Sequence, residues 1–312
     1  MSDQNNNWER GVLEKLALSA LQEQRRARHW GIFFKVLTFG YLFVVLFIFM
    51  GWLGKSDSAL STEKQTALVD LQGVISADSA ASADNLIPSL QDAFKDKNTQ
   101  GVILRINSPG GSPVQSGQIN DEIRRLRAQH PDIPLYVVVE DICASGGYYI
   151  AAAADKIFVD KASLIGSIGV LMDGFGFTGT MEKLGVERRL ITAGANKAFL
   201  DPFSPANPEH KVYIKEMLAQ IHQQFITVVR QGRGNRLKET PDTFSGLIWN
   251  GEKSIEIGLA DGYGSLESVA RDVVKAERIV DFTMKENFAD RLAKRFGAGV
   301  ASAFPGFSAK LN

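Results

Sequence analysis

The chain of 312 residues carries 35 Lys and Arg against 35 Asp and Glu, and hydrophobic residues make up 45% of it. This composition is that of an ordinary globular protein, and a net charge of zero gives no electrostatic reason to expect a nucleic-acid partner. One cysteine, Cys143, excludes an intramolecular disulfide, and four scattered histidines lack the spacing of metal ligands, so we expect no metal centre.

A long apolar segment lies close to the N-terminus. Residues 31–53 contain one charged side chain, Lys35, and Trp30 and Trp52 bracket the segment. As a helix the segment would span roughly 35 Å at about 1.5 Å per residue, which is enough to cross a bilayer. A cleaved signal peptide is the alternative, but the apolar run is long for one and a polar stretch of about thirty residues precedes it.

The charges that flank this segment predict its orientation. Arg25, Arg26 and Arg28 precede it, whereas Lys55 alone follows closely. The positive-inside rule therefore places residues 1–30 in the cytoplasm and everything after the membrane helix outside it. A polar linker over 54–66 leads into the rest of the chain.

Strand and helix patterns alternate in the next hundred residues. Apolar, β-branched runs predict strands, and apolar residues at helical spacing predict the helices between them. The expected strands cover 67–75, 101–111, 133–140 and 156–160, and the expected helices cover 80–97 and 113–129, with another starting after Ser145. This alternation is the signature of an α/β fold.

The second half of the chain gives weaker patterns. A run of small and β-branched residues covers 164–170, and a strand is expected over 186–192. Helices are expected over 208–232 and 265–276, and an amphipathic helix over 285–296 precedes a tail that is not expected to be ordered.

Two glycine-containing turns follow neighbouring strands, at 107–111 and 143–147. In open α/β sheets, ligands bind beyond the carboxyl ends of the strands, so both turns are expected at one site. Ser145 lies in the second turn with Gly146 and Gly147 behind it. A serine there has an accessible hydroxyl and free N–H groups beside it, as a nucleophile needs. The alternative is an ordinary strand-to-helix turn capped by serine.

A nucleophilic serine needs a base. His130 precedes the strand and should lie at its far end, while His210 and His222 fall on a long polar helix and are expected to be solvated. Lysine is the other known activator, and Lys197 lies in a loop among small and apolar neighbours. Lowering a lysine pKa from about 10.4 to about 7.5 takes roughly 4 kcal/mol of desolvation. An exposed loop lysine without a role is the alternative.

Two further features complete this hypothesis. The side chain of Asp201, four residues after Lys197, must point away from the ammonium, because a carboxylate would keep it charged. The oxyanion donors would be the backbone N–H of Gly146 and that of Gly110 or Gly111 on the neighbouring strand end.

Four motifs in order resemble the bacterial signal peptide peptidase A-type family of serine peptidases. They are NSPGGS at 107–112, ASGGYYIAAAAD at 144–155, IGSIGV at 165–170 and NKAFLDPFSP at 196–205. The resemblance spans roughly 68–266 and suits the short, single-copy branch with one membrane helix. It implies a ClpP/crotonase-like domain, which we place at 67–276, followed by a C-terminal helix and tail at 277–312.

The resemblance also implies the chemistry. Ser145 would be the nucleophile and Lys197 the general base, with Gly110 or Gly111 and Gly146 forming the oxyanion hole and Ser167 bonding the lysine. It implies no cofactor. Family members assemble into rings in which neighbouring subunits help to complete the dyad, and they cut signal-peptide remnants and other membrane-released peptides.

Two other functions are compatible with these motifs. A crotonase-type acyl-CoA enzyme shares the glycine oxyanion architecture, but an exported domain would not meet cytoplasmic acyl-CoA. An inactive scaffold for membrane quality control is the other, and the presence of both Ser145 and Lys197 argues against it.

Overall fold

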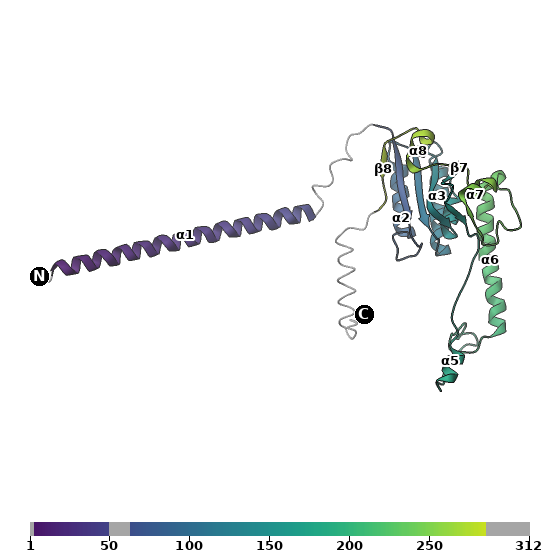
Figure 1. The fold of residues 1–312 in the computed structure, drawn as a ribbon, viewed down its shortest axis with the longest axis horizontal. Coiled ribbons are helices and arrows are strands. Elements are labelled where there is room, and N and C mark those ends of the chain that lie inside the picture. The colour runs from purple at the N-terminus through teal and green to yellow at the C-terminus, as the bar shows by residue number, and fades with distance from the viewer. Residues whose placement is uncertain (1–2, 50–62, 285–312) are drawn as a thin grey trace. The chain divides into compact units, whose positions relative to one another are not determined.

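The computed structural model describes residues 3–49 and 63–284 (Figure 1). The chain divides into two units, Met1–Thr62 and Glu63–Asn312, each of which is described by itself. Trp52, most of the expected linker and the expected helix over 285–296 lie outside the described residues. The domain boundaries expected from the sequence stay predictions.

The described residues of the first unit form one helix, α1 (Asp3–Phe49). Within it, Glu23–Phe47 has a mean hydropathy of 1.9 and is long and apolar enough to cross a membrane, by length and composition. Its apolar side chains are exposed, with Phe39 72% accessible. This helix is consistent with membrane association.

The second unit is built on an eight-stranded sheet with the order β6-β5-β3-β2-β1-β8, in which β4 pairs with β3 and β7. All strand pairs are parallel except β5 with β6. The expected α/β class is therefore confirmed. The strands are β1 (Gln65–Gln72), β2 (Thr99–Ser108), β3 (Leu135–Ala144), β4 (Lys156–Val159), β5 (Leu164–Gly166), β6 (Ile248–Asn250), β7 (Gly262–Tyr263) and β8 (Ile279–Asp281).

Helices cover the two faces of this sheet unequally. The larger core cluster lies between one face and helices α2 (Ala83–Lys95), α3 (Pro113–Gln129), α4 (Gly146–Ala151) and α6 (Pro208–Arg233). A smaller cluster packs the other face against α8 (Leu266–Val269) and the π-helical turn η2 (Ala270–Val274). These two elements are contiguous and give a helical stretch over 266–274 where a helix was expected over 265–276, and the stretch ends at Lys275, which takes a left-handed conformation.

The sequence around the site explains why α3 and α4 begin where they do. Ser112 caps α3 by accepting a hydrogen bond from the Gln115 N–H, and Pro113 occupies the first helical position. Strand β3 is longer than the expected 133–140 and continues to Ala144, so it leads directly into Ser145 and α4. Both helices therefore start beside the carboxyl ends of β2 and β3.

Helix α6 begins after Asn207, whose side chain accepts a hydrogen bond from the Glu209 N–H. Its buried residues, Phe225, Val229 and Arg233, all belong to its C-terminal half. Residues 171–207 precede it and contain the short α5 (Thr178–Lys183), which lies beyond the N-terminal end of α6 (Figure 1).

The strand expected over 186–192 does not form, and that prediction was wrong. These residues are exposed, with Ile191 at 96%, and no described strand runs beside them. A strand is stabilised by hydrogen bonds to a neighbouring strand, so an apolar sequence without such a neighbour does not suffice.

Candidate active site

Ser145 stands at the point where β3 ends and α4 begins. Its backbone has φ 51° and ψ −120°, a conformation that residues other than glycine rarely adopt. Such a conformation costs on the order of 1–3 kcal/mol and persists where the surroundings hold it, often at functional sites. Here the Ser145 N–H donates to the Gly166 carbonyl at 2.8 Å, and the Ser145 carbonyl accepts from the Tyr149 N–H at 2.9 Å.

Two backbone N–H groups without partners lie next to this serine. In the described part of the chain, neither the Gly111 N–H nor the Gly146 N–H donates a hydrogen bond to another group. The two peptides lie close together, since a Cβ built on Gly146 would be 3.2 Å from the Gly111 nitrogen. An oxyanion formed on attack by Ser145 would find two donors at this place.

Gly110 has a different role. Its N–H donates to the Ser108 hydroxyl at 3.1 Å, and its carbonyl accepts from the Ile75 N–H at 2.9 Å. A Cβ on Gly110 would lie 2.6 Å from the Gly146 nitrogen and 2.7 Å from the Ser145 Cβ. Of the two alternatives left by the sequence, the geometry favours Gly111 as donor and gives Gly110 the role of leaving space for Ser145.

A cavity of about 550 Å³ opens in front of Ser145. The strand end contributes Ser145 and Gly146, and the segment after β5 contributes Ser167 and Gly169. Helices α4 and α6 contribute the apolar side chains of Tyr149, Ile221 and Phe225, and the start of α3 and residues 170–171 and 245–246 complete the wall. Apolar walls with a few polar groups among them are typical of a ligand-binding cavity.

Ser167 lies on the wall of this cavity, as its expected role near the dyad requires. It also has φ 51°, and its N–H donates to the Leu247 carbonyl at 2.7 Å. The next residue, Ile168, is fully buried, and its carbonyl lies 3.1 Å from Nε2 of His222. Hydrogen bonds therefore hold the backbone at Ser167 and at Ile168, the residue that follows it.

The expectation that His222 is solvated was wrong, because its ring is half-buried and bonded to Ile168. The sequence contains a signal for this. His222 lies three, seven and eleven residues before Phe225, Val229 and Arg233, which are the buried residues of α6. This spacing places His222 on the same face of the helix.

The structure does not bring Lys197 to Ser145 within one chain. Lys197 is exposed in the segment 171–207 and is not among the residues that line the Ser145 cavity. Its ammonium has no hydrogen bond or ion pair with any described residue, while its backbone N–H donates to the Gly194 carbonyl at 3.1 Å. The proposed base is thus free of a carboxylate but separated from the serine.

Asp201 is engaged elsewhere, as the hypothesis requires. The Ser204 hydroxyl donates to its carboxylate at 2.6 Å, and Arg188 lies 3.3 Å away. The hydrogen bond from Ser204, together with the Phe203 N–H and Arg188, lowers the pKa of Asp201 below its usual value against the smaller effect of desolvation.

Cys143 is fully buried in the core, and burial raises the pKa of its thiol far above the usual range. A thiol in this state is a packing residue and not a second nucleophile. Among residues 3–49 and 63–284, no group of three or more His, Cys, Asp or Glu side chains is placed to hold a metal ion.

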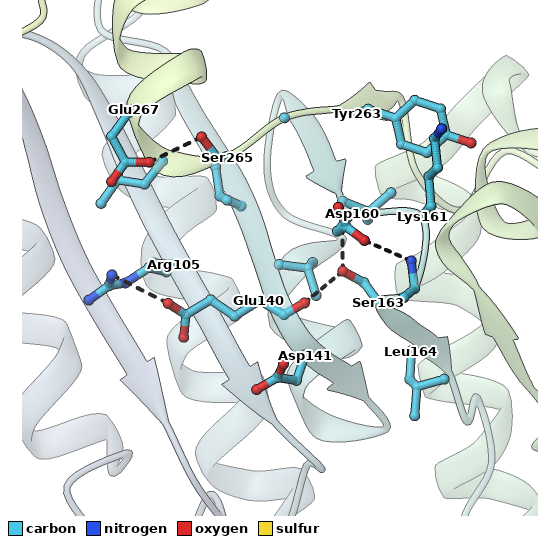
Figure 2. Close-up of a pocket in the computed structure, with 16 residues that line it drawn as sticks. Arg105, Glu140, Asp141, Asp160, Lys161, Ser163, Leu164, Tyr263, Ser265 and Glu267 are labelled. Atoms are coloured by element: carbon cyan, nitrogen blue, oxygen red, sulfur yellow. Dashed lines mark hydrogen bonds and ion pairs between the residues drawn. The ribbon is translucent and has the colours of Figure 1, made fainter.

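A second, larger cavity of about 900 Å³ lies between the end of β3, the loop after β4 and the start of α8 (Figure 2). Its polar groups are engaged with one another. Arg105 and Glu140 form an ion pair at 3.3 Å, and the Ser163 hydroxyl donates to the Glu140 carbonyl at 2.6 Å. Val138 and Leu266 in its lining belong to the smaller core cluster, so this cavity is distinct from the Ser145 site.

A model of a known family matches the stretch of chain that holds the serine. The model, described as Peptidase family S49, covers residues 127–280, from the end of α3 to β8. Residues 127–280 of this chain are thus similar to a peptidase S49 domain. The match to this peptidase family supports a serine peptidase, and both Ser145 and Lys197 lie inside the matched range.

Two proteins with sequences similar to this chain carry different names. A protein of Brucella melitensis named "Na(+)/H(+) antiporter NhaA" is 47% identical over 182 residues, which are 58% of this chain and 25% of that protein. A protein of Enterococcus faecium named "Putative signal peptide peptidase SppA" is 36% identical over 206 residues, which are 65% of this chain and 58% of that protein. This chain thus spans less than two thirds of either relative.

The solved structure of a ClpP1 mutant from Listeria monocytogenes is also similar. The TM-score is 0.40 and the sequence identity is 16%. The match covers 64% of the chain described here and 91% of the ClpP1 chain. We transfer no residue role from a similarity at this level.

Proposed function

We propose that this chain is a membrane-anchored serine endopeptidase in which Ser145 is the nucleophile and Lys197 the general base. One observation carries the proposal. Ser145 is held in an unusual backbone conformation beside two unpaired N–H groups, those of Gly111 and Gly146, and faces an apolar-walled cavity.

The reaction would proceed in two halves. The Ser145 Oγ attacks the scissile carbonyl carbon while its proton passes to the neutral amine of Lys197, and the carbonyl oxygen becomes an oxyanion held by the N–H groups of Gly111 and Gly146. Collapse of this intermediate breaks the C–N bond, and the leaving amine takes the proton from Lys197. A water molecule then attacks the acyl-enzyme by the same route and releases Ser145.

We infer that Lys197 reaches Ser145 of a neighbouring copy in a homo-oligomeric ring. The segment that carries Lys197 is rich in exposed apolar side chains, which a soluble surface rarely gathers in one place. They include Leu171, Phe175, Leu184, Val186, Ile191 and Leu200. Contact with a second copy would bury them and surround Lys197 with the apolar groups that a lysine base requires. Ser167, on the wall of the Ser145 cavity, would then bond the incoming lysine.

The proposed location follows from the first unit. Glu23–Phe47 would anchor the chain in a bacterial inner membrane, and the arginines before residue 31 support a cytoplasmic N-terminus with the catalytic unit outside the cytoplasm. A site tethered near the bilayer, with Tyr149, Ile221 and Phe225 in its wall, suits apolar peptides. We therefore propose signal-peptide remnants and other membrane-released peptides as substrates.

Two single variants of the full-length protein test the dyad. Ser145→Ala should abolish both labelling by a fluorophosphonate probe and hydrolysis of fluorescent casein, because the attacking oxygen is gone. Lys197→Ala should reduce both by at least about 10²-fold, the usual contribution of a general base. Lys211→Ala, on an exposed lysine of α6, is the control and should behave as the unchanged protein. Near-normal turnover by Lys197→Ala would show that the base is wrong.

Complementation tests whether the dyad forms between copies. A mixed assembly of Ser145→Ala and Lys197→Ala subunits contains sites where an intact Ser145 meets an intact Lys197 from its neighbour. We expect co-expressed subunits to recover up to about a quarter of the normal activity, by random mixing of neighbours. No recovery in assemblies shown to contain both subunits would mean that the dyad forms within one chain.

A further inference from the structure

One side chain links α6 to the wall of the Ser145 cavity. Nε2 of His222 lies 3.1 Å from the carbonyl oxygen of Ile168. Because a carbonyl oxygen only accepts, Nε2 carries the hydrogen and donates it. The ring is half-buried at the place where α6 passes the segment that follows β5.

The segment that receives this bond follows β5, and several other contacts hold it: the Ile168 side chain is buried in the core, and the Gly169 N–H donates to the Ser167 carbonyl at 2.9 Å. The Gly166 carbonyl accepts from the Ser145 N–H, and the Ser167 N–H donates to the Leu247 carbonyl. Ser167 has a positive φ, so without such contacts its backbone would relax toward an ordinary conformation. The His222 bond holds the peptide that joins Ile168 to Gly169, and Ser167 and Gly169, on either side of Ile168, both line the cavity.

His222 also stands where α6 leaves the body of the molecule. Residues 208–220 of α6 include none that is buried, whereas the buried residues begin at Phe225. Ile221 and Phe225, on either side of His222, line the same cavity as Ser167. The bond from His222 to Ile168 therefore fixes two walls of one cavity relative to each other.

We propose that His222 is a positioning residue for the peptide substrate, an inference that rests on the proposed peptidase function. Its ring bonds the Ile168 carbonyl and not Ser145, so it acts on the shape of the cavity and not on the reacting atoms. Loss of the bond loosens the peptide between Ile168 and Gly169 and lets the α6 wall move relative to it. The affinity for an extended peptide should therefore fall by more than the rate at which Ser145 reacts.

Three substitutions separate this role from a general effect on folding. His222→Phe keeps an aromatic ring at this position but removes the N–H group that donates to the Ile168 carbonyl. In His222→Gln the amide nitrogen can occupy the position of Nε2 and donate to Ile168. His222→Asn is polar but too short to reach, and it serves where the phenylalanine variant does not fold. Gln223→Leu, on the exposed neighbour, is the matched control for a change on α6.

The assay uses the full-length protein in detergent with a fluorogenic peptide that has leucine before the scissile bond. His222→Phe and His222→Asn should raise KM about two- to tenfold, the range that one net hydrogen bond gives, with kcat changed less than twofold. The rate of labelling of Ser145 by a small fluorophosphonate should also change less than twofold. His222→Gln should restore KM, and Gln223→Leu should leave all values unchanged.

Other results would overturn the inference. An unchanged KM in both non-donating variants would remove the positioning role. A fall in kcat and in labelling together, not restored by glutamine, would make His222 a part of the chemistry or of the general packing. Ser145→Ala run beside these variants keeps the two proposals apart. Retained hydrolysis in that variant would refute the peptidase site, whereas its loss with normal His222 variants would refute only the positioning role.

Discussion

A methyl group on Gly146 would enter the space between the two proposed oxyanion donors. Its Cβ would lie 2.5 Å from the Ser116 hydroxyl and 3.2 Å from the Gly111 nitrogen. The first contact is an overlap that a packed interior resists at a cost of about 1–3 kcal/mol. The second places carbon where the oxyanion would bond the Gly111 N–H. Losing one such donor costs roughly 3–4 kcal/mol, so Gly146→Ala should react about 10²–10³ times more slowly.

A second substitution separates the two effects. Ser116→Ala removes the hydroxyl that the new methyl group would strike, and by itself it should cost about 1 kcal/mol, because that hydroxyl donates to the Ser112 carbonyl. In Ser116→Ala/Gly146→Ala, the unfolding temperature should recover toward that of Ser116→Ala, while the rate of fluorophosphonate labelling should stay low. Recovery of both stability and labelling in the double variant would refute the location of the oxyanion site.

Two further predictions concern the buried network beneath α4. Tyr148→Phe removes a hydroxyl that donates to the Leu259 carbonyl at 2.8 Å, so the free energy of unfolding by urea should fall by about 1–3 kcal/mol. Asp261→Asn should cost about 3–5 kcal/mol in the same measurement, because it leaves the fully buried Arg233 guanidinium without its carboxylate. Burial is the largest single influence and opposes ionisation of Asp261, but the bonds and charge of Arg233, the Ile157 N–H and the charge of Arg236 together outweigh it and hold the pKa of Asp261 below the ordinary 3.8. Its contribution is therefore fully present above pH 3.8 and is lost as pH falls through that lowered pKa, and a urea series below pH 4 should show a shallower decline in the Asn variant.

The sheet could be predicted from the sequence because its signals are local. Each central strand is an apolar, β-branched run between turns, and the helix over 113–129 has its cap and its proline at the first turn. The register that brings Ser108 opposite Cys143 follows from two parallel strands ending together, so the two glycine turns had to meet. The S49 match then agrees with the resemblance carried by the motifs.

The parts that could not be predicted depend on contacts between distant residues. The choice between Gly110 and Gly111 is made by the Ser108 hydroxyl, whose direction no motif encodes. The role of His222 depends on where the carbonyl of Ile168 points, although its helical spacing to Phe225 was visible. The strand predicted over 186–192 does not form because no strand lies beside it, and the position of neighbouring strands depends on the whole fold.

The separation of Lys197 from Ser145 gives the proposed mechanism a physical consequence. The serine side of the site is complete within one chain, because β3, α4 and the turn after β2 position Ser145 and both N–H donors. The base lies on an exposed apolar segment. On this proposal, a single copy holds a correctly placed but unactivated serine, and association supplies the base. Activity per subunit should then fall on dilution in detergent, while the fold around Ser145 stays intact, because the burial that holds it lies inside one subunit.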